Sequence, residues 1–332
     1  MGSAAENRWS RQRLWWFSAI EGAFLGIIYR LLFDVNAKWI SSGSFPLIMT
    51  IAFLTIVPMC MGYVAVDNYL RNAPIENVRW FKWLFIPWIS VLIAMAVSLI
   101  LNWEGAICVI FAAPLLLGSS LIGGLIARFT WKGLKHRAQG TLSAVAFPVL
   151  AILIEAHVPS FLETRSVETD IVIHAPAAIV WDNIKSVHEI ESNELPQSWI
   201  NRIGFPKPVT ATLSREGIGG IRQATFTGGL VFTETVNLWE PGADLRFSIH
   251  ANTDSIPKST LDEHVTIGGA FFDVLDGEYQ LLPQSNGVLL RLTSHERLST
   301  HFNPYAGAWT DAVMRAIQNQ ILQVIRKRCE NG

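Results

Sequence analysis

Five long apolar runs in the first half of the chain constrain its fold more than any other feature. They comprise Leu14–Phe33, Phe45–Val66, Phe81–Leu101, Ala106–Ala127 and Leu142–Val158. A helix needs about 20 apolar residues to cross the hydrocarbon core of a bilayer. The whole chain is 50% hydrophobic and 16% charged, so we predict that residues 1–158 form a transmembrane bundle of five helices. The fifth run is the weakest, because Pro148 and Glu155 interrupt it.

Basic residues between these runs predict the orientation of the bundle, because Lys and Arg in short loops stay on the cytoplasmic side. One side collects Arg8, Arg11, Arg13, Arg71, Arg79, Lys82, Arg128, Lys132, Lys135 and Arg137. The opposite side receives Arg30 and Lys38. We therefore expect an integral membrane protein with its N-terminus in the cytoplasm, and five spans place everything after Val158 outside it. A re-entrant fifth run would instead return the C-terminal domain to the cytoplasm.

One acidic residue, Glu21, lies well inside a predicted span. A charge at that depth is costly, so Glu21 is a candidate intramembrane functional group. Packing against a neighbouring helix explains it equally well. Gly22 and Gly26 form a GxxxG spacing on the same helix, which allows two backbones to approach closely. We expect these contacts within the bundle rather than between two copies of the chain.

The composition changes abruptly after the fifth run. We predict a linker at residues 159–166 and a second domain at residues 167–332, where short apolar segments alternate with polar residues. Strands are expected at Val167–Ile173, Val209–Arg215, Gly220–Phe226, Val231–Trp239, Leu245–His250, Phe271–Leu282 and Val288–Arg297. Short glycine-containing turns such as Gly228-Gly229 join them, which predicts an antiparallel meander. The lack of Asn-x-Ser/Thr sequons in this domain fits a bacterial inner membrane.

A long amphipathic helix is predicted at the end of the chain, from Asn303 to Arg328. Asn303 suits a helix N-cap, and Pro304 suits the first helical position. Apolar residues then recur every three or four positions: Tyr305, Ala308, Trp309, Ala312, Val313, Ala316, Ile317, Ile321, Val324 and Ile325. A stripe of this length requires a long apolar partner. The second domain is therefore predicted to be α+β, with a curved antiparallel sheet wrapped around this helix and a small cavity between them.

Four segments of the second domain, taken in order, carry a family resemblance. They are Val172–Asp182, Gly217–Arg222, Leu238–Phe247 and the closing helix. Together they resemble the START and polyketide cyclase/dehydrase superfamily over about Val167–Arg328. The resemblance implies a helix-grip fold whose hydrophobic cavity takes a lipid, a sterol, a polyketide or another apolar ligand. Carriers, receptors and enzymes are built on this scaffold, so the fold alone does not assign a function.

Strand alternation indicates which residues face such a cavity. Glu234 lies on the more apolar face of its strand, where a carboxylate can orient a ligand hydroxyl or act as a base with a raised pKa. A salt bridge or a surface position is the alternative. On the last strand Glu296 shares a face with apolar residues, and His295 is expected to point outward. The candidate ligand-binding residues are Phe232, Glu234, Val236, His250, Leu292, Tyr305 and Trp309.

Composition and motif spacing exclude several classes of function. A formal net charge of -1 leaves no basic surplus for nucleic acid. The sequence has no CxxC, HxxxH or HExxH spacing, so neither a metal site nor a cofactor is predicted. It also has no GxSxG motif and no phosphate-binding loop. The expected partners are the lipid bilayer and a hydrophobic small molecule or lipid, and the sequence names no protein partner.

Three functions remain open at this point. The first is a membrane-anchored binding or carrier protein that exchanges a hydrophobic molecule with the outer leaflet. The second is a polyketide cyclase- or aromatase-like enzyme in which Glu234 or Tyr305 performs acid/base work on a substrate in the same cavity. The third is a ligand sensor whose membrane half receives the signal. The first requires no catalytic constellation, and the sequence shows none.

Overall fold

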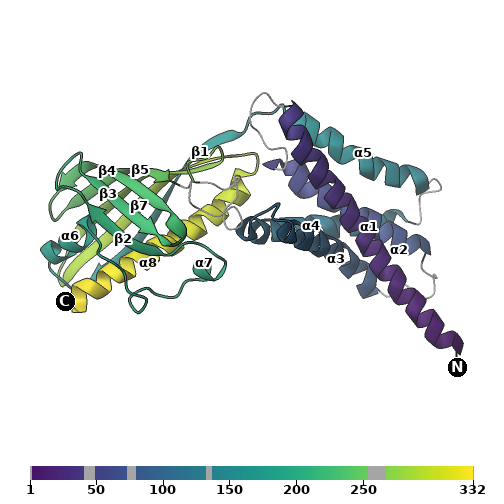
Figure 1. The fold of residues 1–332 in the computed structure, drawn as a ribbon, viewed down its shortest axis with the longest axis horizontal. Coiled ribbons are helices and arrows are strands. Elements are labelled where there is room, and N and C mark those ends of the chain that lie inside the picture. The colour runs from purple at the N-terminus through teal and green to yellow at the C-terminus, as the bar shows by residue number, and fades with distance from the viewer. Residues whose placement is uncertain (1, 41–48, 73–79, 132–136, 253–266, 332) are drawn as a thin grey trace. The chain divides into compact units, whose positions relative to one another are not determined.

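The computed structural model describes residues 2–40, 49–72, 80–131, 137–252 and 267–331 (Figure 1). Contacts between Cα atoms divide the chain into two compact units. One holds Met1–Glu104 and Cys108–Pro159, and the other holds mainly Ser160–Gly332. We call them the helical unit and the sheet–helix unit.

The helical unit contains α-helices at α1 Gly2–Ile40, α2 Val57–Asn72, α3 Trp80–Ile100, α4 Ala106–Thr130 and α5 Arg137–Glu155, and a π-helical turn at Ala52–Ile56. Within the described residues, four segments are long and apolar enough to cross a membrane: Arg13–Phe33, Ala52–Asn72, Trp83–Ile100 and Ala106–Thr130. The described apolar part of α5, Ala144–Glu155, is shorter. Four of the five predicted spans are therefore candidates by length and composition. The fifth predicted span falls on α5, whose described apolar part is not among these candidates.

Small residues bring the helices of this unit together. A Cβ atom added to Gly22 would lie 2.8 Å from the backbone oxygen of Met61, and one added to Gly26 would lie 2.5 Å from Met61 Sδ. The GxxxG glycines of α1 therefore pack against α2 of the same chain, as predicted. At Gly123 of α4, an added Cβ would lie 1.7 Å from the backbone oxygen of Met59, so a side chain there would force the two helices apart.

The C-terminal end of α5 contacts the start of the second candidate span. The backbone N–H groups of Ile51 and Ala52 donate to the Glu155 carboxylate at 2.6 and 2.7 Å. This carboxylate satisfies amides that the beginning of a helix leaves unpaired. Phe33, at the end of the first span, contacts Phe53 with 6.1 Å between ring centroids. The C-terminal end of α5 is therefore at the end of the bundle where the first span finishes.

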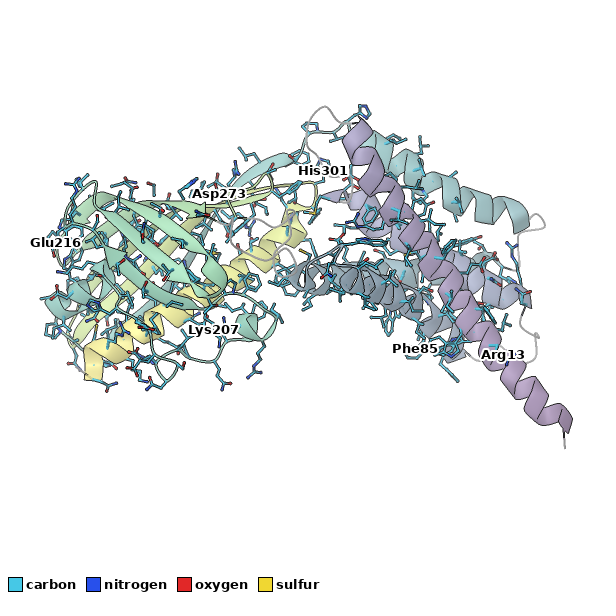
Figure 2. All side chains as sticks on the ribbon, in the orientation of Figure 1. Arg13, Phe85, Lys207, Glu216, Asp273 and His301 are labelled. Carbon is cyan, nitrogen blue, oxygen red and sulfur yellow. The ribbon has the colours of Figure 1, made fainter. Side chains whose placement is uncertain are left out.

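The sheet–helix unit is built on one antiparallel sheet with the strand order β1-β7-β6-β5-β4-β3-β2. Its strands are β1 Phe161–Ile173, β2 Pro208–Leu213, β3 Ile221–Phe226, β4 Val231–Glu240, β5 Asp244–Asn252, β6 Phe272–Gln284 and β7 Gly287–Thr300. Helices α6 Ala177–Lys185, α7 Trp199–Arg202 and α8 Asn303–Asn331 complete it, with a 3-10 turn at Thr227–Gly229. The predicted antiparallel sheet followed by a long C-terminal helix is confirmed. In Figure 2, Glu216 and His301 mark opposite ends of this unit.

The first strand begins earlier than predicted. Residues 161–166, which we expected in the linker 159–166, are paired with β7, and Phe161 stands opposite Thr300. The sequence does not indicate this part of the strand, because the charged residues Glu163 and Arg165 occupy positions that face α8, where a strand pattern would have apolar residues. Arg165 is balanced there by Asp311 of α8, with Nη2 donating to Oδ2 at 2.8 Å.

Helix α8 runs along one face of the sheet, where it packs on β1 and β7 (Figure 1). Its C-terminal half is apolar on that face and places Leu322, Ile325 and Cys329 in the main core. This core also contains Trp181 of α6 and Val236 of β4. The sheet and the two helices therefore share one apolar interior.

The N-terminal half of α8 meets the sheet through polar side chains, which corrects part of the predicted stripe. Gln318 was expected off the stripe but is buried, and its Nε2 donates to Val167 O at 3.1 Å and Ser294 Oγ at 3.0 Å. Asn303 does not cap the helix as predicted. Its carboxamide accepts from the Thr300 backbone N–H at 2.8 Å and donates to Phe161 O at 2.7 Å. Hydrogen bonds thus add to apolar contacts here, such as the packing of Met314 with Val167 and Val274.

Candidate ligand-binding site

The inner face of the sheet, which we define as the face toward α8, is apolar over its centre. Val236, Phe247, Tyr279 and Leu292 come from four different strands and belong to one buried cluster. They lie together because inward-facing positions alternate along each strand and adjacent strands keep these positions in register. The result is an apolar surface bounded by β4 on one side and α8 on the other.

A buried ion pair interrupts this surface. Arg222 of β3 stands directly opposite Glu234 of β4 in the strand register. Their exposed fractions are 3% and 6%, and Arg222 Nη1 donates to Glu234 Oε2. An isolated charge in an apolar interior is costly, so each of these residues requires the other.

Two aromatic residues complete the site. Arg222 Cζ lies 5.4 Å from the centroid of the Phe247 ring, within the range of a cation–π contact. The rings of Phe247 and Tyr279 have centroids 6.1 Å apart, and the Tyr279 side chain shares a hydrogen bond with Arg222. We call Arg222, Glu234, Phe247 and Tyr279 the arginine site.

One donor of the arginine site is unused. Arg222 Nε is buried and has no hydrogen-bond partner among the described residues. A buried donor without a partner costs about 1–3 kcal/mol, and evolution rarely leaves such a group without a reason. A carbonyl, carboxylate or hydroxyl oxygen of a bound molecule would satisfy it.

Burial and the ion pair act on the protonation of the site in opposite directions. Burial raises the pKa of the Glu234 carboxyl, and the Arg222 guanidinium opposes that rise. Burial also raises the pKa of Tyr279, so its hydroxyl stays protonated and can donate. Glu234 takes the salt-bridged role that the sequence left as its alternative. Because Arg222 Nη1 donates to Glu234 Oε2, one of the two carboxylate oxygens is already engaged within the protein.

The structure brings together part of the predicted set of ligand-binding residues. Glu234 and Val236 both face inward from β4, and Leu292 joins Val236 in the main core. Phe232 packs in an adjacent cluster with Ala211 and Ala224. Their role as ligand contacts stays a prediction.

Other predicted site residues lie elsewhere. His250 is exposed and lies on the opposite face of β5 from Leu245 and Phe247, because alternation along the strand directs it outward. Tyr305 and Trp309 are half-buried on the first turns of α8 and are not members of the main core. Glu21 is exposed on α1 of the helical unit. The structure does not assemble these four residues with Glu234.

The sequence did not single out Arg222 or Tyr279 as site residues. Alternation on β3 could have identified Arg222, because it shares the inner face with Ala224. Tyr279 is harder to place from the sequence. The β6–β7 register shifts between Val274 and Asp276, which changes which residues of β6 face inward.

Comparison with known proteins gives no family assignment. No protein-family model and no curated protein matches this chain. A crystal structure of DynU16, from the dynemicin biosynthetic locus, is similar at 14% identity and a TM-score of 0.31 over 49% of this chain and 46% of its own. Protein CV1439 from Chromobacterium violaceum is similar at 15% identity and a TM-score of 0.32 over 50% and 96%. The di-domain ARO/CYC BexL, from the BE-7585A biosynthetic pathway, is similar at 14% identity and a TM-score of 0.33 over 64% and 61%. The chain thus aligns with less than two thirds of DynU16 and of BexL.

Proposed function

We propose that this protein is a membrane-anchored binding or carrier protein for a hydrophobic small molecule or lipid, held in the interior of the sheet–helix unit. The arginine site carries the proposal, because it presents the unused Nε donor of Arg222 beside an otherwise apolar surface. Small-molecule sites combine mostly apolar walls with a few polar groups that fix the orientation of the ligand. The ligand is therefore an apolar body that carries an oxygen acceptor.

The geometry of the helical unit supports a sheet–helix unit outside the cytoplasm. Glu155, at the end of α5, binds the amides that begin the second candidate span. The chain therefore leaves the helical unit at the end where the first span finishes, away from Arg13. Basic residues gather around the N-terminal end of that span, which is the cytoplasmic pattern. A ligand bound in the proposed position would be exchanged with the outer leaflet.

Mass spectrometry of the purified full-length protein tests the proposal. We expect an unmodified lipid or other hydrophobic molecule to copurify with the wild type. The test variant replaces Arg222 with Met and Glu234 with Leu together, since breaking one partner alone leaves a buried charge and costs about 3–5 kcal/mol. The double variant should fold with near-native stability, because apolar replacement of both partners is often neutral. It should lose most of the copurifying molecule.

The matched control replaces Arg246 with Met and Glu278 with Leu together. Arg246 also faces a carboxylate across adjacent strands, with its Nη2 2.5 Å from Glu278 Oε1, but its side chain is half exposed. This variant should keep the bound molecule. Equal retention by the double variant and the wild type would contradict the proposal, and so would a wild type that carries no hydrophobic molecule. Recovery of a chemically converted product would favour the cyclase- or aromatase-like enzyme instead.

A further inference from the structure

The first two residues of β1 expose large apolar side chains. Phe161 is 68% exposed and Leu162 is 70% exposed. Among the described residues of the sheet–helix unit, no other large apolar side chain exposes a larger fraction. Successive side chains of a strand point to opposite faces, so the start of β1 is apolar on both faces. We call these two residues the β1 tip.

The backbone of the β1 tip is held in the sheet. Phe161 is paired with Thr300 of β7, and Leu162 is paired with Ser299. The Asn303 carboxamide adds a hydrogen bond at the same end, with its Nδ2 donating to Phe161 O at 2.7 Å. A change of side-chain rotamer cannot bury both apolar residues in the core, because they leave β1 on opposite faces. The β1 tip therefore keeps an apolar surface that the sheet–helix unit does not cover.

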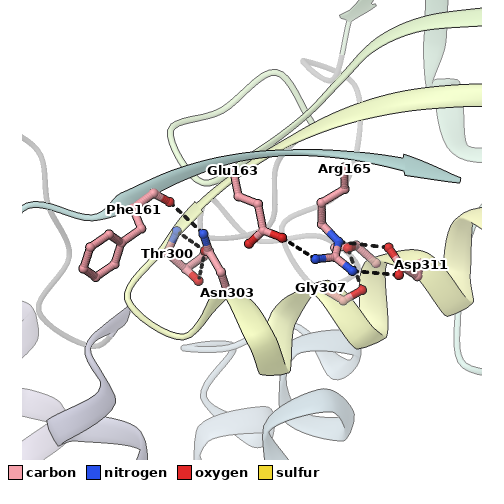
Figure 3. A network of polar contacts seen from close by, with 8 residues as sticks. Phe161, Glu163, Arg165, Thr300, Asn303, Gly307 and Asp311 are labelled. Atoms are coloured by element: carbon pink, nitrogen blue, oxygen red, sulfur yellow. Dashed lines mark hydrogen bonds and ion pairs between the residues drawn. The ribbon is translucent and has the colours of Figure 1, made fainter.

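The charged residue that follows the β1 tip in the chain is paired within the protein. Arg165 donates to Glu163 and also to the Asp311 carboxylate at 3.0 and 2.8 Å (Figure 3). Figure 3 shows the Phe161 ring pointing away from this network. A paired charge costs less free energy near lipid than an isolated one. Glu163 thus has its own counter-ion beside an apolar environment.

The chain reaches the β1 tip from an exposed apolar face of α5. Leu150, Ile154 and Val158 are 58%, 61% and 45% exposed, and a spacing of four residues places them on one side of a helix. The Val158 N–H donates to Glu155 O at 2.9 Å, so Val158 stays within one turn of the end of α5. Three residues then lead to Phe161, which is at most about 11 Å of extended chain. Lipid that covers this face of α5 is therefore within reach of the β1 tip.

We propose that the β1 tip inserts into the bilayer that holds the helical unit, in the layer where lipid headgroups meet acyl chains. This inference goes beyond the proposed function and does not require a bound ligand. Phe and Leu suit this layer because they bury apolar surface there. Lipid surrounds an inserted tip and contacts both faces of β1, whereas the surface of a folded protein partner covers one face. Exposure on both faces therefore favours lipid over a second copy of the chain.

Photocrosslinking of the full-length protein in phosphatidylcholine nanodiscs tests the proposal. The photoreactive residue p-benzoylphenylalanine replaces one residue at a time, and irradiation bonds it to a nearby C–H group. Mass spectrometry of the intact protein measures the fraction that carries one added lipid. Phe161→p-benzoylphenylalanine and Leu162→p-benzoylphenylalanine should both form this adduct. Phe17, which is 65% exposed in the first candidate span, provides the reference yield for a residue in lipid.

Ile218→p-benzoylphenylalanine is the matched control. Ile218 is apolar, 65% exposed and part of the same unit. It lies two residues from Glu216, which marks the opposite end of this unit from His301 in Figure 2. His301 directly follows Thr300, the partner of Phe161 in the strand register. The control should form about tenfold less lipid adduct than the β1 tip, because water surrounds it instead of acyl chains.

Three outcomes would overturn the proposal. One is a lipid yield at Phe161 and Leu162 no higher than the yield at Ile218. Another is an adduct at only one of the two tip residues, since an inserted tip contacts lipid on both faces of β1. The third is a crosslink from the tip to a second copy of the chain in place of lipid, which would make this end of the unit an interface between protomers.

Discussion

At the scale of single residues, Glu296 is where burial and charge conflict most directly. Burial raises its pKa to about 7 from an ordinary value of 4.5. A hydrogen bond with Thr310 and the charge of Arg165 oppose this rise, and Asp311 of α8 adds to it. The folded protein therefore holds this proton more tightly than the unfolded chain does. The carboxyl group is neutral in mild acid and becomes charged inside an apolar interior as the pH rises.

We predict that this single group makes the protein less stable as the pH rises. The contribution is fully present below pH 4.5 and is lost as the pH increases through about 7, a change of roughly 3 kcal/mol. Glu296→Gln removes the titrating group and should flatten this part of the profile. Thermal unfolding of both proteins between pH 4.5 and 8 measures the difference, and parallel profiles would show that the group does not titrate in this range.

Individual residues also show what a sequence can predict about a site. The alternation of apolar and polar residues correctly predicted that Glu234 and Glu296 face the interior. Successive side chains of a strand point to opposite faces, so this prediction requires only the local sequence. It could not show that Arg222 pairs with Glu234 while Glu296 meets Thr310 and Asp311 of α8. Those facts depend on which strands are adjacent, and the sequence alone does not contain that information.

At the scale of elements, α8 organises the sheet–helix unit by binding the long connection between α6 and β2 as well as the sheet. Arg328 is the main link: its Nε and Nη2 each donate to the Glu194 carboxylate at 2.8 Å, and Nη2 also donates to Glu189 O at 2.8 Å. Gln320 adds bonds to Pro196 O at 3.0 Å and Asn201 Oδ1 at 2.6 Å. The connection is therefore held against α8 by polar side chains that lie outside the predicted apolar stripe.

Breaking the Glu194–Arg328 contact should loosen this connection. Hydrogen bonds from Arg328 hold the pKa of Glu194 down, to about 2, so the contact stabilises the protein above about pH 4.5 and weakens as the pH falls toward 2. We expect Glu194→Gln to lower the hydrogen-exchange protection of residues 188–205 at pH 7. The exposed Glu189→Gln in the same segment is the control. The difference from the wild type should shrink below pH 4.5, and a difference that persists at pH 2.5 would contradict this assignment.

At the scale of the whole molecule, the two units bury their residues in two different ways. The helical unit has close backbone contacts at Gly22, Gly26 and Gly123, which suit helices packed in lipid. The sheet–helix unit instead buries an alternating pattern against α8, as a water-exposed domain does. Under the proposed function, the side of the membrane on which the second unit lies decides which leaflet can supply its ligand.

Reporter fusions after Gly332 test the topology. We expect a phosphatase that is active only outside the cytoplasm to be active at this position, and a fluorescent protein that folds only in the cytoplasm to stay dark. Fusions after Arg71 should give the opposite result, because that residue lies on the basic side of the bundle. Fluorescence at Gly332 would place the sheet–helix unit in the cytoplasm and make the fifth helix re-entrant.

The sequence by itself determined the elements of this protein, because apolar runs, strand alternation and the periodicity of α8 are set by neighbours in the chain. It predicted the meander from β2 to β7 and the long terminal helix. Tertiary structure decided the early start of β1, the burial of Gln318 on α8 and the partners of Arg222. Each of these features depends on a charged or amide side chain that the sequence would suggest is exposed to solvent. In the fold, this side chain makes a hydrogen bond with a residue more than ten positions away in the chain. Burial of such groups is stable only in the assembled fold, where their hydrogen-bond partners come together.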